Sequence, residues 1–432
     1  MDLARSALYP PAAVARHPQI GNGEIRRIPR LTVSSYGYQL LGMATRRLAT
    51  RPSQRKAAIP GYLAASIGAI VVVAMPLVAR LVDGSADEFN GRTFAIAAAS
   101  GWLICAALFS VILTRWLQFL LSVEEGPVMA LAYDALPLLL ISAWVVLVLA
   151  LVGGHWLLAT AAAALCVYHL ALVIPRMVSA HRPHWTKHAP TLDLVVANVY
   201  IDNETPQDAA RQLVDANVDL VILVESTKSF LQVFDQVGGA ATYPNRVTDP
   251  DDDSDYAVTI VTKLPLGPRT SMKRIGPLCL AIADVEVDGI NTLVIALNPM
   301  ATVDPSGHVT WKEQIDVLKE FVPTLEGPFI IAGDLNTTQY RPEFQELLAL
   351  GLSDAIDSLG KGLNPSFKLG AKGVLSTIGA VARLDHALVN EHMHALAITN
   401  LEPCGSDHLP FSLNVAVRAS VGHSSKSDRQ SQ

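Results

Sequence analysis

The segment from Gly333 to Asn336, Gly-Asp-Leu-Asn, carries a carboxylate and an amide two residues apart. It follows a short apolar run, Phe329 to Ala332, which predicts a buried strand that ends at a flexible glycine. Asp334 and Asn336 would therefore lie on a tight loop at the edge of a sheet. A carboxylate and an amide suit a divalent cation and a phosphate oxygen, although ordinary turns use the same residue types.

Further polar residues stand at the ends of other predicted strands. Asn198 lies near the end of the apolar run from Leu192 to Val199, and Glu225 ends the run from Leu220. Two later segments place Asp beside His next to the last two predicted strands: Arg383-Leu-Asp-His386 and Ser406-Asp-His408. An imidazole whose tautomer is fixed by a carboxylate can exchange a proton near neutral pH, although a single Asp-His pair can equally be a surface or capping pair.

Charge is distributed unevenly over the 432 residues. Residues 1–190 carry 16 Lys and Arg against 8 Asp and Glu, a net charge of +8, whereas residues 191–432 carry 17 against 31, a net charge of −14. Apolar residues make up 50% of the chain and charged residues 17%, which exceeds the hydrophobicity of an ordinary soluble enzyme. The four cysteines lie far apart with no metal-ligand spacing, so they predict neither a disulfide framework nor a metal site.

Four uncharged stretches each approach the length of about 20 residues that crosses a bilayer as a helix. They are residues 57–79, 93–114, 135–154 and 156–175. Buried core helices are the alternative, but four such runs in succession favour membrane insertion. We therefore predict a transmembrane region over residues 57–178, preceded by a basic tail (1–56) that is either disordered or a surface helix.

The basic flanks suggest how this region is oriented. The tail holds ten Lys and Arg, and Arg176, Arg182 and Lys187 follow the fourth stretch, whereas the first connector is acidic. Four crossings would place both ends in the cytoplasm, and three crossings would turn the C-terminal half outward. The short loops and the absence of a eukaryotic targeting signal predict a multi-pass protein of a bacterial inner membrane.

A polar linker (179–190) precedes a segment that alternates strand and helix signals, residues 191–418, and a disordered tail (419–432) follows it. The predicted strands of this segment are 192–199, 220–224, 257–262, 278–287, 292–297, 329–332, 384–389 and 411–417. The predicted helices are 206–216, 308–322 and 342–350. About eight strands with few intervening helices predict an α/β domain of two packed sheets rather than one doubly wound sheet.

The order of these motifs resembles the endonuclease/exonuclease/phosphatase superfamily, which includes nucleases, neutral sphingomyelinases and inositol polyphosphate phosphatases. The resemblance covers about residues 192–417. It rests on Val195-Val-Ala-Asn-Val199, Val221-Ile-Leu-Val-Glu225, Gly333-Asp-Leu-Asn336, Leu384-Asp-His386 and Ser406-Asp-His408. It implies a four-layer sandwich of two mixed β-sheets flanked by helices, and Mg²⁺- or Mn²⁺-dependent cleavage of phosphate esters.

The resemblance also implies a role for each motif residue. Glu225 would be the main metal ligand, supported by Asn198 and Asp407. Asp334 would orient or deprotonate the attacking water, and Asn336 would hold a phosphate oxygen. His408, oriented by Asp385, would handle a proton or stabilise the charge of the transition state. A metal-bound hydroxide is an alternative to a protein general base.

One departure from the family pattern concerns Asn298. Many members place a His there, at the end of the strand before the Gly-Asp-x-Asn segment, and an amide can hydrogen-bond a phosphate oxygen but cannot readily donate a proton. The departure at Asn298 therefore leaves open which residue would protonate the leaving group.

The substrate follows less directly from the sequence. The net charge of −14 disfavours a nuclease, because nucleases bind phosphates through Lys and Arg. Membrane attachment favours a lipid headgroup or another membrane-linked phosphate ester. We therefore predict a membrane-anchored phosphodiesterase or phosphatase, with a membrane-anchored nuclease and a non-catalytic binding domain as the alternatives.

Overall fold

The computed structural model describes residues 91–121, 126–249, 252, 254–302, 304–369 and 379–419. The chain divides into two compact units, residues 1–53 and 54–432, and every described residue belongs to the second. The predicted basic tail, the first predicted span (57–79) and the C-terminal tail beyond residue 419 lie outside the described residues.

The first described part of the chain is helical. It consists of α3 (Gly91–Leu121), α4 (Pro127–Asp134), α5 (Leu136–Val152) and α6 (Trp156–Met177). Among the described residues, Ala97–Gln118 and Trp156–Met177 are long and apolar enough to cross a membrane. The helices α4 and α5 qualify together as a third candidate, but they meet at an angle of 65°. Two or three of the predicted spans therefore have matching helices.

The surface of α5 is the opposite of what a water-soluble helix shows. Val145, Val148, Leu149 and Val152 are between 58% and 85% exposed, while Leu136, Leu140 and Ala143 on the other face are buried against the neighbouring helices. Large contiguous apolar surfaces of this kind mark a contact with lipid or protein.

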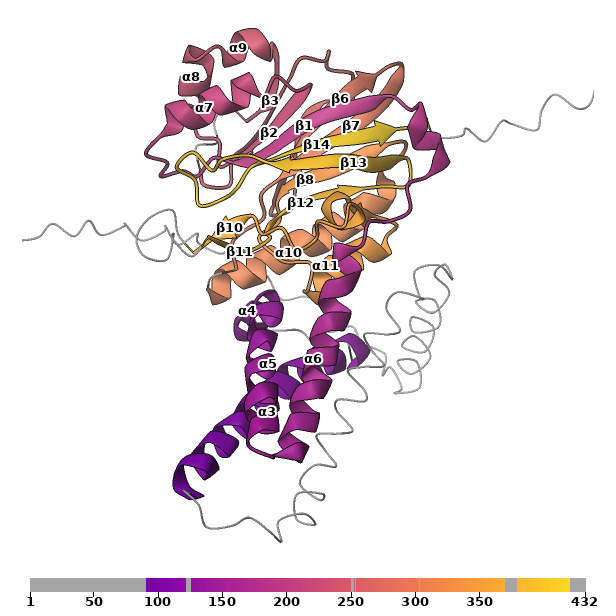
Figure 1. Cartoon of the computed structure of the whole chain (residues 1–432). Helices are drawn as coiled ribbons and strands as arrows, with labels where there is room; N and C mark the ends of the chain where they lie inside the picture. Colours follow the sequence, from indigo (N-terminus) through magenta and orange to yellow (C-terminus); the bar gives the residue numbers. More distant parts are fainter. Residues whose placement is uncertain are drawn as a thin grey trace, which may run out of the picture. The chain divides into compact units, whose positions relative to one another are not determined.

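The rest of the chain folds around two six-stranded sheets (Figure 1). The first sheet has the order β13 (Met393–Asn400), β14 (Phe411–Val417), β1 (Thr191–Asn198), β2 (Leu220–Val224), β4 (Val258–Thr262) and β3 (Asn245–Thr248). The second has the order β5 (Ser271–Ile275), β6 (Leu278–Val287), β7 (Ile290–Leu297), β8 (Phe329–Asp334), β12 (Asp385–Val389) and β9 (Ser353–Asp354). A short ribbon joins β10 (Phe367–Lys368) to β11 (Ala380–Ala382). Both large sheets are mixed, because β1 pairs with β2 and β7 pairs with β8 in parallel while their other pairs are antiparallel.

Helices cover the outer face of each sheet, as Figure 1 shows. The first sheet carries α7 (Pro206–Asp215), α8 (Lys228–Gln236) and α9 (Gly239–Thr242), and the second carries α10 (Pro305–Phe321) and α11 (Pro342–Ala349). A separate core between the sheets includes Val196, Ile222 and Ile330. Strands buried on both faces read as continuous apolar runs, which is why β2 and β8 were recognisable in the sequence.

The predicted sandwich of two mixed sheets flanked by helices is confirmed. All eight predicted strands and all three predicted helices are present, with ends within about three residues of the predicted ones. The sequence analysis did not predict β3, β5, β9, β10, β11 and β13. These strands are short, or, like β5 and β13, are partly exposed edge strands with few large apolar residues.

Gly333 directly precedes Asp334 in β8, and both its backbone conformation and its close packing require a glycine. Its φ of +148° is unfavourable for other residues, and a Cβ there would lie 2.1 Å from the backbone oxygen of Leu297. We expect Gly333→Ala to destabilise the protein by about 2 kcal/mol or more.

Gly289 provides the matched control, because it also has a positive φ (+81°) but nothing within 4 Å of an added Cβ. Gly289→Ala should cost only about 1 kcal/mol. Thermal unfolding of the full chain in detergent, followed by near-ultraviolet circular dichroism, measures both variants. Equal losses of stability would show that the close approach to Leu297 does not matter.

Candidate active site

Two carboxylates come together because β8 and β12 are neighbours. Asp334 is the last residue of β8, Asp385 is the first of β12, and the antiparallel register sets them directly opposite each other. His408 lies between them, with its Nδ1 2.7 Å from Asp385 Oδ2 and its Nε2 3.6 Å from Asp334 Oδ2. All three side chains are buried. The structure therefore assembles the Asp-His pair predicted from the sequence and adds Asp334 to it.

The first sheet brings two more of the predicted residues to the same place. Asn198 ends β1, and Glu225 follows β2 directly, so the parallel pairing of these strands aligns their ends. The Asn198 amide donates to Glu225 Oε1 at 2.8 Å and to Asp334 Oδ2 at 3.2 Å. This one amide thus links the carboxylates of both sheets.

Two site residues have a strained backbone. Glu225 has a φ of +58° and Asn336 a φ of +49°, both in the left-handed region that residues with a Cβ rarely adopt. Glu225 is held there partly because its Oε2 accepts a hydrogen bond from the Ile201 N–H at 2.9 Å. Non-glycine residues in this conformation concentrate at functional sites.

Asp334, His408 and Asp385 form an Asp-His-Asp group. Burial and the charges of the neighbouring side chains set the protonation of Asp334 and His408. Burial raises the pKa of Asp334 to about 7, in spite of the opposing charge of His408, and the nearby Asp385 carboxylate adds to the rise. Burial alone would lower the pKa of His408, but the Asp385 and Asp334 carboxylates together raise it to about 10. His408 is therefore an imidazolium that donates a hydrogen bond to Asp385.

A divalent cation fits the Glu225 side of the site. Burial raises the pKa of Glu225, and the negative charge of Asp407 adds to this rise. Asp407 Oδ1 is buried and has no hydrogen-bond partner among the described residues. Crowded carboxylates with an unsatisfied oxygen are the hard ligands that Mg²⁺ and Mn²⁺ prefer.

The Asp-His-Asp group also has a spacing that suits a metal, since its three ligand atoms lie within 4.8 Å of one another. The two ring nitrogens of His408 already face carboxylate oxygens, Asp385 at 2.7 Å and Asp334 at 3.6 Å, so the ring is placed to donate protons to them. The carboxylates of Glu225 and Asp407 are the candidates to hold a cation. Asn198 would support it through the second lone pair of its Oδ1, which accepts one hydrogen bond, from the Tyr200 N–H at 3.0 Å.

Two amides face each other beyond Asp334. The Nδ2 of Asn336 donates to the backbone oxygen of Pro299 at 2.9 Å and to Oδ1 of Asn298 at 3.3 Å, which uses both of its N–H groups. The Nδ2 of Asn298 donates to the Asp255 oxygen at 2.9 Å, and its second N–H has no acceptor among the described residues. In this arrangement Asn298 offers the donor for a phosphate oxygen, and Asn336 orients Asn298.

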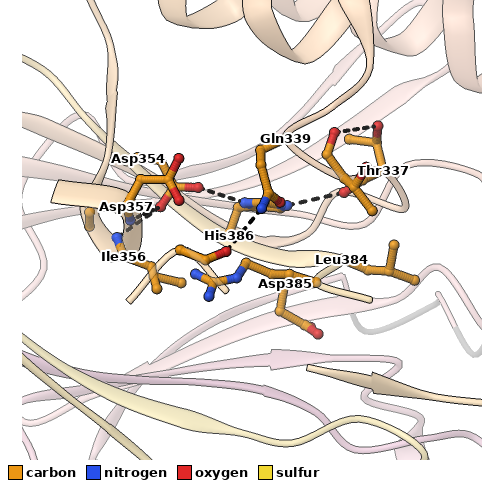
Figure 2. Close-up of polar contacts among 12 residues, drawn as sticks. Thr337, Gln339, Asp354, Ile356, Asp357, Leu384, Asp385 and His386 are labelled. Atoms are coloured by element: carbon orange, nitrogen blue, oxygen red, sulfur yellow. Dashed lines mark hydrogen bonds and ion pairs between the residues drawn. The ribbon is translucent and has the colours of Figure 1, made fainter. Parts of the chain in front are cut away.

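The structure adds two positioning features for which the sequence analysis proposed no role. Ser406 donates to the Asn198 backbone oxygen at 2.8 Å and accepts from the His408 N–H at 3.0 Å, so it ties the loop between β13 and β14 to the end of β1. His386 and Asp354 form a second, fully buried pair at 2.7 Å (Figure 2). Ser406 and His386 both belong to motifs quoted from the sequence, whereas Asp354 lies 31 residues before Asp385 and no motif marks it.

Comparison with known proteins agrees with this geometry. Residues 195–408 match the model of the Endonuclease/Exonuclease/phosphatase family. This part of the chain is therefore a domain of that family, whose members include phosphodiesterases, phosphatases and nucleases that use divalent metals. No curated protein matches the chain in sequence.

Several solved structures are similar to part of this chain. Humanized D. rerio TDP2 carrying 14 mutations is 17% identical, with a TM-score of 0.43, and 52% of this chain covers 99% of that one. Sphingomyelinase C from Streptomyces griseocarneus is 15% identical, with a TM-score of 0.39 and the same coverage. A beta toxin mutant from Staphylococcus aureus, solved with bound magnesium ions, is 18% identical, with a TM-score of 0.39 and again the same coverage.

The raised pKa values predict how pH affects metal binding. Glu225, Asp407 and Asp334 all have pKa values above the ordinary range for carboxyl groups, so at mildly acidic pH protons compete with a cation for this region. We expect the apparent affinity for Mn²⁺ to increase from about pH 6 to pH 8, by up to about tenfold per pH unit for each proton released. Calorimetric titration of the full chain with Mn²⁺ at several pH values measures this dependence.

The control for this titration is Asp193→Asn, which changes a carboxylate at the far end of β1. It should leave the pH dependence intact, whereas Glu225→Gln should remove most of the Mn²⁺ binding. An affinity for Mn²⁺ that does not vary with pH would contradict the assignment of the buried carboxyl groups.

Proposed function

We propose that this protein is a membrane-anchored, Mg²⁺- or Mn²⁺-dependent hydrolase of phosphate esters, a phosphodiesterase or phosphatase. The observation that carries the proposal is the convergence of an imidazolium and several carboxylates from two sheets on one buried point. His408, Asp385 and Asp334 form one side of it, and Asn198 connects them to Glu225. Charged groups are costly to bury together, so such a cluster is retained for its chemistry.

Glu225 and Asp407 would hold the cation, which supplies positive charge that neutralises the phosphate and eases attack by water. Asp334 is suited to align that water and accept its proton. Its Oδ1 accepts from the Asn336 N–H at 2.8 Å, its Oδ2 accepts from Asn198, and a pKa of about 7 suits a base at cellular pH. In-line attack depends on this fixed alignment.

The charge that develops on the phosphate needs hydrogen-bond donors. His408, held by Asp385, would donate from its Nε2, and Asn298 would donate from its unused N–H. Because Asn298 lacks an acidic proton, His408 is the better candidate to protonate the leaving group. The substrates that fit membrane attachment and an acidic domain are lipid headgroups and other membrane-linked phosphate esters.

Turnover in the full chain tests the proposed residues. We expect Asp334→Asn and His408→Gln each to lower kcat by about 10² to 10⁴, because each removes a group that handles a proton or holds developing charge. The assay follows bis(para-nitrophenyl) phosphate, a phospholipid and a plasmid, with Mg²⁺, with Mn²⁺ and with a chelator.

Asp193→Asn again serves as the control and should keep full activity. Preference for the phospholipid or the small diester supports the proposed substrate class, and preference for the plasmid would instead identify a nuclease. A wild-type chain that turns over none of the three substrates with either metal would refute the proposed hydrolase.

Membrane anchoring has its own test. The exposed apolar face of α5 and the lengths of α3 and α6 favour integral insertion. We expect the full chain to stay with the membrane fraction after extraction with alkaline carbonate and to be released only by detergent. Release by carbonate would indicate peripheral attachment.

A further inference from the structure

The loop that follows β8, residues 335–341, connects the catalytic strand to α11 and is almost entirely buried. On the side of the sandwich, Trp311 donates to the Leu335 oxygen at 2.9 Å, and His386 Nε2 lies 3.0 Å from the Thr337 oxygen (Figure 2). A carbonyl oxygen only accepts, so His386 donates here while its other nitrogen faces Asp354. The sandwich thus holds the first half of the loop.

The apolar helices hold the second half. Asp134, the last residue of α4, accepts from both the N–H and the Oγ1 of Thr338 at 2.8 Å. Arg115 of α3 donates from Nε to the Tyr340 oxygen at 3.0 Å. Arg176 of α6 lies with its guanidinium carbon 4.9 Å from the centre of the Tyr340 ring.

Most of the charged residues in the apolar helices contact this one loop. Helices α3 to α6 contain only four charged residues, Arg92, Arg115, Asp134 and Arg176, and three of these four reach residues 338–340. A charge in an apolar helix is costly unless it is satisfied, and such residues usually have a function. Asp134 is satisfied by Thr338 and by the Arg341 guanidinium, 3.8 Å away.

The position of the loop explains what these contacts can do. Asn336 is its second residue, Asp334 directly precedes it, and Asn336 is in turn the residue that orients Asn298. Thr338 is only two residues from Asn336, so a shift of its backbone is transmitted to the groups that align water and phosphate. An error of about 1 Å in such alignment can cost about a hundredfold in rate.

We propose that Asp134 and Arg115 are positioning residues for hydrolysis, so that the apolar helices form part of the catalytic apparatus as well as an anchor. Asp134 fixes Thr338, Arg115 fixes Tyr340, and together they set the position of Asn336 and Asp334. This inference rests on the proposed hydrolase function. The simpler alternative is that these contacts only dock the helices against the sandwich.

The experiment compares variants of the full chain in lipid nanodiscs, with bis(para-nitrophenyl) phosphate and Mn²⁺. We expect Asp134→Ala to lower kcat about 10- to 100-fold while KM stays within about twofold. Asp134→Asn keeps an oxygen that can accept both bonds from Thr338, so it should retain activity within about threefold of wild type. Thr338→Val keeps the backbone bond to Asp134 but removes the hydroxyl bond to Asp134 and the longer bond, 3.4 Å, that the hydroxyl accepts from the Tyr340 N–H. Its kcat should fall between those of the two Asp134 variants.

Ser110→Ala is the matched control in the helices, because the Ser110 hydroxyl donates only to the Ala106 oxygen within α3. It should leave kcat unchanged. Normal kcat in Asp134→Ala would overturn the proposal, as would a loss in Asp134→Asn as large as that in Asp134→Ala. If Asp134→Ala fails to fold, Thr338→Val decides the question, and normal kcat in that variant counts against positioning.

A second measurement does not depend on turnover. Hydrogen–deuterium exchange of residues 335–341 should be faster in Asp134→Ala than in wild type or Ser110→Ala, while exchange in the distant strand β6 stays the same. Unchanged exchange in the loop would show that Asp134 does not hold it. Absence of wild-type turnover would remove the proposed function, and the exchange result would still decide whether the helices position this loop.

Discussion

Repulsion among buried carboxylates is the constraint on which this structure depends. The register of β8 and β12 places Asp334 opposite Asp385, and the alignment of β1 with β2 brings Glu225 to the same corner. The sandwich tolerates this crowding because two hydrogen-bond donors lie between the carboxylates. These donors are the His408 imidazolium and the Asn198 amide. A cation would neutralise the oxygens that remain unsatisfied, so the same electrostatic imbalance that costs stability would favour a bound metal.

The apolar segments and the residues at strand ends were predictable for a simple physical reason. Strands buried on both faces must be apolar throughout, so Leu220 to Val224 and Phe329 to Ala332 are conspicuous in the sequence, and a polar residue directly after such a run marks a sheet edge. Asn198, Glu225 and Asp334 were found in this way, whereas Asp385 and His408 were found in Asp-His pairs that open or precede a strand. Edge strands such as β5 and β13 were missed, because a strand with one exposed face has a weak apolar pattern.

Contacts that depend on tertiary structure were not predictable. Asp354 caps the short helix α12 (Ala355–Ser358), which a local pattern can suggest, but its bond to His386 depends on the pairing of β12 with β9. The bonds between Asp134 and Thr338 join residues 204 positions apart. Sequence spacing carries no information about such pairs, whereas a lone charge in an apolar helix does indicate that a partner must exist.

The left-handed backbone at Glu225 has a consequence for how this protein can evolve. A glycine at position 225 would relieve a conformational cost of about 1 kcal/mol and would also remove a half-buried carboxylate whose charge the fold disfavours. Selection for stability alone would therefore favour the loss of this acid. A glutamate whose backbone and charge are both unfavourable makes residue 225 a point where stability and chemistry oppose each other.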